Sequence, residues 1–143
     1  MTGSTGGGLA ATTFFTRTYD EAQALLFATR DYVEDARAFS WSNPTLALLH
    51  SAETLRVTTR LTHIMAWLLV QRAVHAGELT SEEARADAMR LDGREVCLEA
   101  GAETSAALPE RLRGLLERSR RLYQRIARLD QMVAAADRPM DVP

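Results

Sequence analysis

The chain has 143 residues and a mass of 15.8 kDa, which suits one domain and is too short for two independent cores of about 100 residues each. Hydrophobic residues make up 46% of it and aromatic residues only 6%, while 8 glycines and 4 prolines are too few for the turns of an all-β fold. The net charge of −2 argues against a general nucleic-acid-binding protein. The composition therefore indicates a single helical domain.

Cysteine content and hydropathy bear on the compartment. Cys97 is the only cysteine, so no intramolecular disulfide can form and a cysteine-based zinc site lacks its other ligands. The longest uninterrupted apolar run covers residues 64–70, far short of the roughly 20 residues that span a membrane. The amino terminus lacks the basic and apolar regions of a signal peptide. We therefore expect a cytoplasmic protein with no membrane segment.

The first 13 residues are rich in glycine, and we expect residues 1–13 to be a flexible leader because they bury too little surface to offset the entropy of ordering them. Thr18 and Glu21 have the spacing of a capping box, which predicts that a helix begins at Thr18. Apolar and small residues then recur at helical spacing. The pattern predicts a helix over residues 18–39.

A long central helix is predicted over residues 45–76. Asn43 or Ser42 can cap its first turn, and Gly77 suits the left-handed position after its last turn. Two apolar stripes run along this helix, which indicates that it is covered from more than one side, and we expect both Leu69 and Ile64 to be core residues. One stripe contains Leu48, Leu55, Thr59, Thr62, Ala66, Leu69 and Ala73, and the other contains Val57, Leu61, Ile64 and Leu68 with Val74 or Met65.

Thr80 begins a second capping-box pattern, which predicts a short helix over residues 81–89 followed by a connecting segment. Apolar residues then recur with near-heptad spacing and predict a third long helix over residues 109–136. The predicted fold is all-α: an antiparallel three-helix bundle over residues 14–136, with a long central helix and a short helix in the connection between the second and third helices. Residues 137–143 are expected to be a short flexible tail.

The candidate catalytic and metal-binding residues form no recognisable active site. His50, His63 and His75 are more than three helical turns apart, too far to share one metal without ligands from elsewhere. His50 and Glu53 could supply two ligands of a di-metal bundle, but the other long helices place apolar residues where further ligands are needed. Cys97 lies among acidic residues, which raise a thiol pKa, and we expect it to be buried and unreactive. We predict no enzymatic activity, no metal and no cofactor.

Charge is unevenly spread along the chain. Residues 111–128 contain seven arginines and one acid, Glu117, whereas residues 78–110 contain nine acids and three arginines. Three of the arginines lie away from the apolar face of the third predicted helix: Arg121, Arg125 and Arg128. This arginine stripe has three open interpretations: an ordinary solvated helix face, a docking surface for an acidic protein partner, or a nucleic-acid-binding surface.

Three segments carry a resemblance to a known family. Residues 14–22 read Phe-Phe-Thr-Arg-Thr-Tyr-Asp-Glu-Ala, and residues 58–61 read Thr-Thr-Arg-Leu. Residues 67–78, the most specific segment, read Trp-Leu-Leu-Val-Gln-Arg-Ala-Val-His-Ala-Gly-Glu. The third predicted helix is similar too, at residues 108–116, Ser119, Leu122, Tyr123 and residues 128–130. The chain thus resembles the alphaproteobacterial regulator of CtrA degradation (RcdA) family over about residues 14–130.

The resemblance implies a three-helix bundle that commonly dimerises and has no catalysis of its own. It further implies a proteolytic adaptor that helps to deliver cell-cycle regulators such as CtrA to the ClpXP protease, alongside a receiver-domain adaptor and a cyclic-di-GMP-binding partner. The predicted lengths also favour a homodimer, because a central helix of about 48 Å outreaches a first helix of about 33 Å. The alternative function is a small helical regulator that binds nucleic acid through its arginine-rich third helix.

Overall fold

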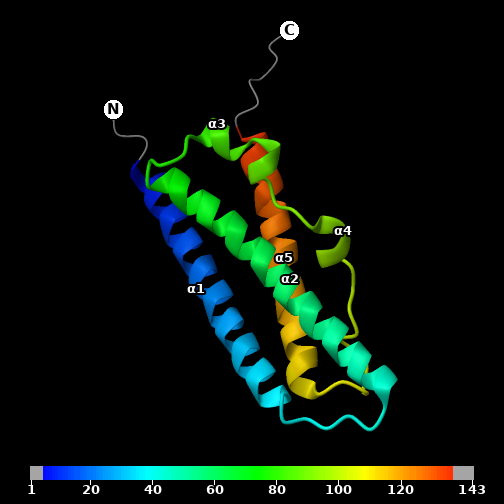
Figure 1. The fold of residues 1–143 in the computed structure, drawn as a ribbon. Coiled ribbons are helices and arrows are strands. Elements are labelled where there is room, and N and C mark those ends of the chain that lie inside the picture. The colour runs from blue at the N-terminus through cyan, green and yellow to red at the C-terminus, as the bar shows by residue number, and fades with distance from the viewer. Residues whose placement is uncertain (1–4, 137–143) are drawn as a thin grey trace.

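The structure, a computed structural model, describes the backbone of residues 5–136 and the side chains of residues 13–136. Within these residues all the regular secondary structure is helical, with no strand (Figure 1). The long helices are α1 (Thr5–Ala36), α2 (Pro44–His75) and α5 (Glu110–Ala135). Between α2 and α5 lie the short helix α3 (Ser81–Ala84), the 3-10 helix η1 (Asp87–Met89) and the short helix α4 (Arg94–Cys97). The predicted all-α bundle of three long helices is confirmed.

Helix α1 begins at Thr5, so the predicted start at Thr18 was wrong. The capping-box spacing was misleading because the Thr18 hydroxyl donates to the carbonyl of Phe14, 2.9 Å away, as a threonine inside a helix does. Glu21 faces α5 instead of its own helix start. Of the expected flexible leader, residues 5–13 lie in α1, and residues 1–4 are outside the described residues, as is the expected tail over 137–143.

The ends of α2 follow the predicted chemistry. The side chain of Asn43 accepts a hydrogen bond from the backbone N–H of Thr45, 2.9 Å away, and Pro44 occupies the first turn. At the other end Gly77 has a φ of 75°, the left-handed conformation that glycine adopts without strain. Thr80 and Glu83 form the predicted capping box of α3. Helix α3 is only 4 residues long, so the predicted helix over 81–89 is interrupted.

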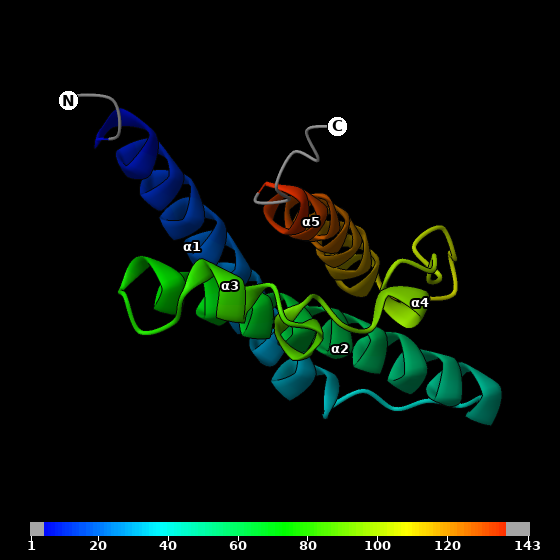
Figure 2. The same ribbon diagram turned by 90° about the horizontal axis from the view of Figure 1, so that it is seen from above.

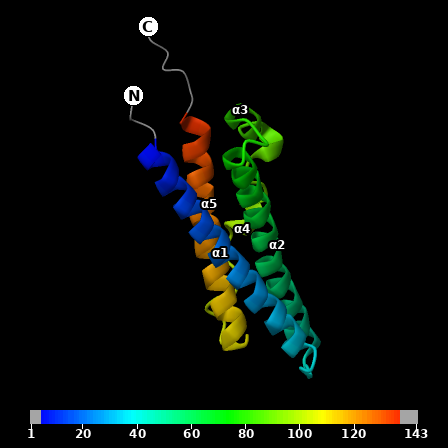
Figure 3. The same ribbon diagram turned by 90° about the vertical axis from the view of Figure 1, so that its left-hand side faces the viewer.

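Helix α2 is the centre of the bundle, because every other α-helix packs against it (Figures 2 and 3). Helix α1 runs antiparallel to both α2 and α5 (Figure 1). Helices α2 and α5 run in the same direction, because the connection over residues 76–109 returns along the length of the bundle before α5 begins. The predicted antiparallel arrangement therefore holds for the two helix pairs that include α1.

Only one of the two apolar stripes of α2 faces the core. The side chains of Val57, Leu61 and Ile64 are fully buried, as expected for the second stripe. The prediction that Leu69 is a core residue was wrong, because its side chain is 49% exposed. The rest of the core comes from α1, α5 and the connection; its large members include Leu25, Tyr32, Leu91, Leu108, Leu112, Leu116, Leu122, Tyr123 and Ile126.

We predict that Ile64→Ala lowers the free energy of unfolding by about 2–5 kcal/mol, because the fully buried side chain leaves a cavity behind. Urea denaturation followed by circular dichroism measures the change. Met132→Ala is the control, since Met132 is 65% exposed and should cost no more than about 0.5 kcal/mol. Equal losses for the two variants would contradict the assigned core.

Candidate functional site

The arginine stripe of Arg121, Arg125 and Arg128 lies on the outer face of α5, as its spacing predicts. Arg121 donates to Glu117 at 2.7 Å, and Arg125 donates to both carboxylate oxygens of Glu21 on α1, at 2.8 and 3.1 Å. Arg128 is exposed. The hydrogen bond to Glu21 raises the pKa of Arg125. Two of the three arginines therefore have acidic partners, one of them from a helix about a hundred residues away in sequence.

These ion pairs are exposed and therefore weak. The side chain of Arg121 is 73% exposed and that of Arg125 is 38% exposed. Pairs of this kind contribute about 0–1 kcal/mol, because water screens them and ordering two long side chains costs entropy. A carboxylate on a partner could replace Glu117 or Glu21 at small cost. The stripe is thus a positively charged face whose internal pairs are easily exchanged.

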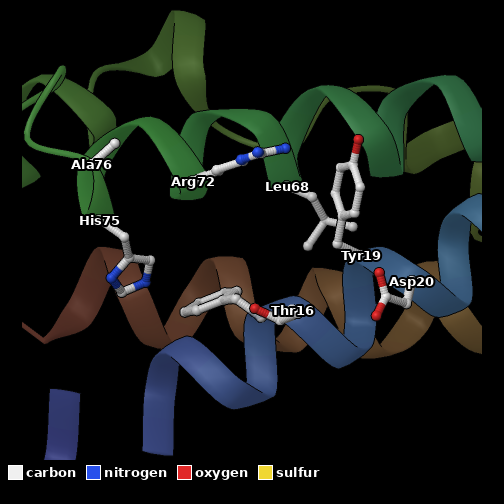
Figure 4. Close-up of a pocket in the computed structure, with 8 residues that line it drawn as sticks. Thr16, Tyr19, Asp20, Leu68, Arg72, His75 and Ala76 are labelled. Atoms are coloured by element: carbon white, nitrogen blue, oxygen red, sulfur yellow. The ribbon is translucent and has the colours of Figure 1, made fainter. Parts of the chain in front are cut away.

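A groove of about 490 Å³ lies between the first half of α1 and the end of α2 (Figure 4). Its walls include Phe15 and Tyr19 on α1 and Leu68, Arg72 and His75 on α2. The Arg72 guanidinium lies 5.6 Å from the centre of the Tyr19 ring, and the ring of Phe15 packs against His75. Sequence reasoning did not predict this groove, although residues 14–22 and 67–78, which carry the resemblance, meet there.

The three histidines lie in separate environments, as their spacing predicts. His50 is buried in an aromatic cluster, with its Nε2 at 2.7 Å from the Tyr32 hydroxyl and its ring 4.7 Å from that of Trp41. Burial lowers the pKa of His50, so it is neutral at pH 7. His63 packs against Gly93, and His75 lines the groove. Among the described residues, no group of three or more histidine, cysteine or acidic side chains could hold a metal ion.

Cys97 is buried, as expected, but the expected reason for its raised pKa was incomplete. Burial is the main cause that raises the pKa of the Cys97 thiol, and the Arg60 guanidinium acts in the opposite direction. The nearby acid that contributes is Asp92. A buried thiol with a raised pKa is a poor nucleophile.

Arg60 is a buried cation that sequence reasoning missed. Arg60 belongs to α2, and its side chain is fully buried. Its guanidinium hydrogen-bonds to both the connection and α5. It donates to the carbonyl oxygens of Cys97, Glu99 and Leu116 at 2.9, 2.7 and 3.0 Å, and to the hydroxyl of Ser119 at 3.3 Å. Burial lowers the pKa of Arg60, whereas the carboxylate of Glu103, 3.7 Å away, raises it. Its position in register with Val57 and Ile64 is the sequence signal that places it on the core face.

Asp130 is the matching buried anion on α5, with a side chain only 2% exposed. Burial by itself raises the pKa of this carboxyl, but the hydrogen bonds that it accepts hold the pKa of Asp130 below its ordinary value. The donors are Trp67 Nε1 at 3.0 Å, two guanidinium nitrogens of Arg90 at 2.9 Å, the Leu91 backbone N–H at 3.3 Å, and Arg94. Asp130 thereby joins α2, the connection and α5.

The described residues thus define a small three-helix bundle whose candidate sites are a groove and helix faces, surfaces suited to contacts with other proteins. No described helix combines the length and the apolar character needed to cross a membrane. The chain belongs to the DUF1465 family of proteins of unknown function, whose model matches residues 7–142.

A solved structure supports the same relationship. The crystal structure of RcdA from Caulobacter crescentus is similar to this chain at 35% sequence identity, with a TM-score of 0.62. The match covers 83% of this chain and 89% of the RcdA chain. No curated protein sequence matches the chain. The resemblance drawn from the sequence is therefore confirmed.

We predict that Asp130→Asn lowers the free energy of unfolding at pH 7 by about 3 kcal/mol, the lower end of the range for breaking a buried ion pair, because Arg90 and Arg94 are about 30% exposed and can rehydrate. A depressed carboxyl pKa stabilises the fold above the unfolded-state pKa of about 3.9 and loses that effect as the pH falls through the folded-state value.

The gap between wild type and Asp130→Asn should therefore narrow as the pH falls below about 4, as measured by urea titrations at several pH values. Asp35→Asn is the control, because Asp35 is 61% exposed and its pair with Arg111 is solvated. A gap that stays constant down to pH 2 would contradict the assigned role of the Asp130 carboxylate.

Proposed function

We propose that the protein is a non-enzymatic adaptor that acts in the cytoplasm and helps to deliver regulatory proteins, of the CtrA-like cell-cycle class, to the ClpXP protease. The observation that carries this proposal is the likeness to RcdA, at 35% identity over 83% of the chain. The partners that follow from this proposal are ClpXP, a receiver-domain or cyclic-di-GMP-binding adaptor, and the protein cargo itself.

An adaptor accelerates degradation without chemistry of its own. It holds the cargo and the protease together, so that their meeting becomes an intramolecular event at a high effective concentration. This mechanism requires at least two separate docking surfaces. The arginine stripe on α5 and the groove between α1 and α2 are two such surfaces, and they differ in chemistry: one is cationic, and the other combines aromatic walls with the Arg72 guanidinium.

We propose that the arginine stripe docks an acidic protein segment. Arg128 is exposed, and the weak pairs of Arg121 and Arg125 can be replaced by carboxylates of a partner. Charged contacts of this kind increase association rates and lose strength with salt. The alternative occupant is nucleic acid, which the net charge of −2 and the neighbouring Glu117 and Glu21 disfavour.

We also propose that the protein forms a homodimer, as the family resemblance implies. The helix-length argument for it does not hold, because α1 and α2 are both 32 residues long. A different ground for the homodimer is the exposed face of α2, where Leu48 is 71% exposed and Leu55 is 65% exposed.

We predict that the purified chain accelerates degradation of a CtrA-like regulator by ClpXP when the receiver-domain and cyclic-di-GMP-binding partners are present. The measurement is the rate of cargo loss with and without the chain. Affinity capture from native lysate should also recover ClpX or the receiver-domain protein. An unchanged degradation rate together with no capture of either protein would overturn the adaptor function.

We predict that replacing Arg121, Arg125 and Arg128 together by Gln weakens capture of the protein partner and reduces the salt dependence of that capture. The fold should be retained, because exposed substitutions usually change stability by no more than about 0.5 kcal/mol. The matched control replaces three other exposed arginines by Gln: Arg17, Arg30 and Arg37.

Both triple variants lose three positive charges, so a difference in partner capture between them depends on where the charges lie and not on how many were removed. Equal capture by the two variants would leave the stripe as an ordinary solvated face. Loss of salt-dependent DNA binding, with protein capture unchanged, would favour the nucleic-acid alternative.

A further inference from the structure

The outward face of α2 is unusual for an exposed helix. The other apolar stripe of the sequence lies there, opposite the buried stripe, and its leucines Leu48, Leu55 and Leu69 are 71%, 65% and 49% exposed. We define the α2 outer face by eight residues: Leu48, Ala52, Leu55, Thr59, Thr62, Ala66, Leu69 and Ala73. Exposed leucines are individually common, but a row of them along one helix marks an interaction surface.

No charged residue interrupts the α2 outer face. The four charged residues of α2 all face other parts of the chain: Glu53 and Arg60 are buried, Arg56 donates to Glu53, and Arg72 lies over Tyr19. The two threonines of the face have internal partners, since the Thr59 and Thr62 hydroxyls each donate to a carbonyl four residues earlier at 2.8 Å. The face can therefore lose its water without leaving a charge or a hydroxyl donor unsatisfied.

The spacing of the α2 outer face is that of helix-to-helix packing. Its eight positions alternate in steps of four and three residues from Leu48 to Ala73, the pattern with which helices interlock in coiled coils. At 1.5 Å per residue this row is about 38 Å long. Such a row fits a second helix laid along nearly the whole of α2.

The order of the residues identifies the occupant. Read from one end, the face is Leu-Ala-Leu-Thr-Thr-Ala-Leu-Ala, and in an antiparallel copy centred between Thr59 and Thr62 each leucine meets an alanine. The facing pairs are Leu48 with Ala73, Leu55 with Ala66, Leu69 with Ala52, and Thr59 with Thr62. Large side chains opposite small ones fill the space between two helices without clashes or voids.

From this complementarity we infer that the α2 outer face binds the same face of a second copy of the chain, antiparallel and about a twofold axis between Thr59 and Thr62. This inference rests on the homodimer proposed above and specifies its interface and register. In a twofold interface both copies use the same face, so no further copy can bind there and assembly stops at the dimer. Since α1 and α5 pack on the opposite side of α2, both arginine stripes stay exposed and the dimer presents two of them.

Sedimentation velocity across micromolar concentrations tests the interface. The wild type should sediment as a dimer, and Leu55→Glu should sediment as a monomer with unchanged helical circular dichroism, because the carboxylate would be buried against Ala66 of the other copy. Met132→Glu is the control, since Met132 is also 65% exposed but lies on α5, and it should remain dimeric.

A size swap tests the register. Ala66→Leu places leucine opposite Leu55 and should weaken the dimer at least about tenfold through overpacking. Adding Leu55→Ala to that variant restores a large-small pair and should recover affinity to within about threefold of the wild type, a rescue that independent sites do not show.

The outcomes separate the two proposals. A wild type that stays monomeric at all concentrations overturns both the homodimer and its interface. A dimer that survives Leu55→Glu overturns the interface alone, and a double variant weaker than either single variant overturns the antiparallel register.

Discussion

The fold depends on two buried ions that hold the connection between α2 and α5 in place. Because α2 and α5 run parallel, the chain must return along the bundle between them, and its backbone polar groups need partners on the way. Arg60 on α2 satisfies the carbonyls of Cys97 and Glu99, while Asp130 on α5 accepts hydrogen bonds from Arg90, Leu91 and Arg94. Each ion is costly to bury alone, but Arg60 donates four hydrogen bonds and Asp130 accepts five. The hydrogen bonds of Arg60 and Asp130 therefore specify one path for the connection.

That path decides which surfaces remain available. With α4 against both α2 and α5, and α1 against the same two helices, the core side of α2 is enclosed and its other side is left open. The exposed leucines of α2 are thus a consequence of where the connection runs. The same packing turns the polar side of α5 outward, where Arg111, Arg121 and Arg125 form exposed pairs with Asp35, Glu117 and Glu21.

The sequence predicted the features that local chemistry controls: a cap at one of Asn43 and Ser42, the left-handed Gly77, the capping box at Thr80 and the apolar period of α5. It failed where long-range contacts decide. The capping-box spacing at Thr18 is identical in a helix interior, and two apolar stripes on α2 do not reveal which one is the core. The arginine stripe was placed on the correct face, but its pairing with Glu21 joins residues on different helices and has no local signal.

The two outward faces differ in what they can bind, and this difference suits an adaptor. The uncharged face of leucine, alanine and threonine on α2 gains binding free energy when its apolar surface is removed from water. A second copy of the chain is a suitable partner, because it is always present at the same concentration. The cationic face of α5, whose ion pairs can be exchanged, would bind acidic partners with a high association rate and with selectivity. Its affinity for them would fall as the salt concentration rises. Permanent self-association through α2 would double the transient sites on α5. When both arginine stripes of a dimer contact the same partner assembly, the dimer binds that assembly more tightly than either stripe alone would.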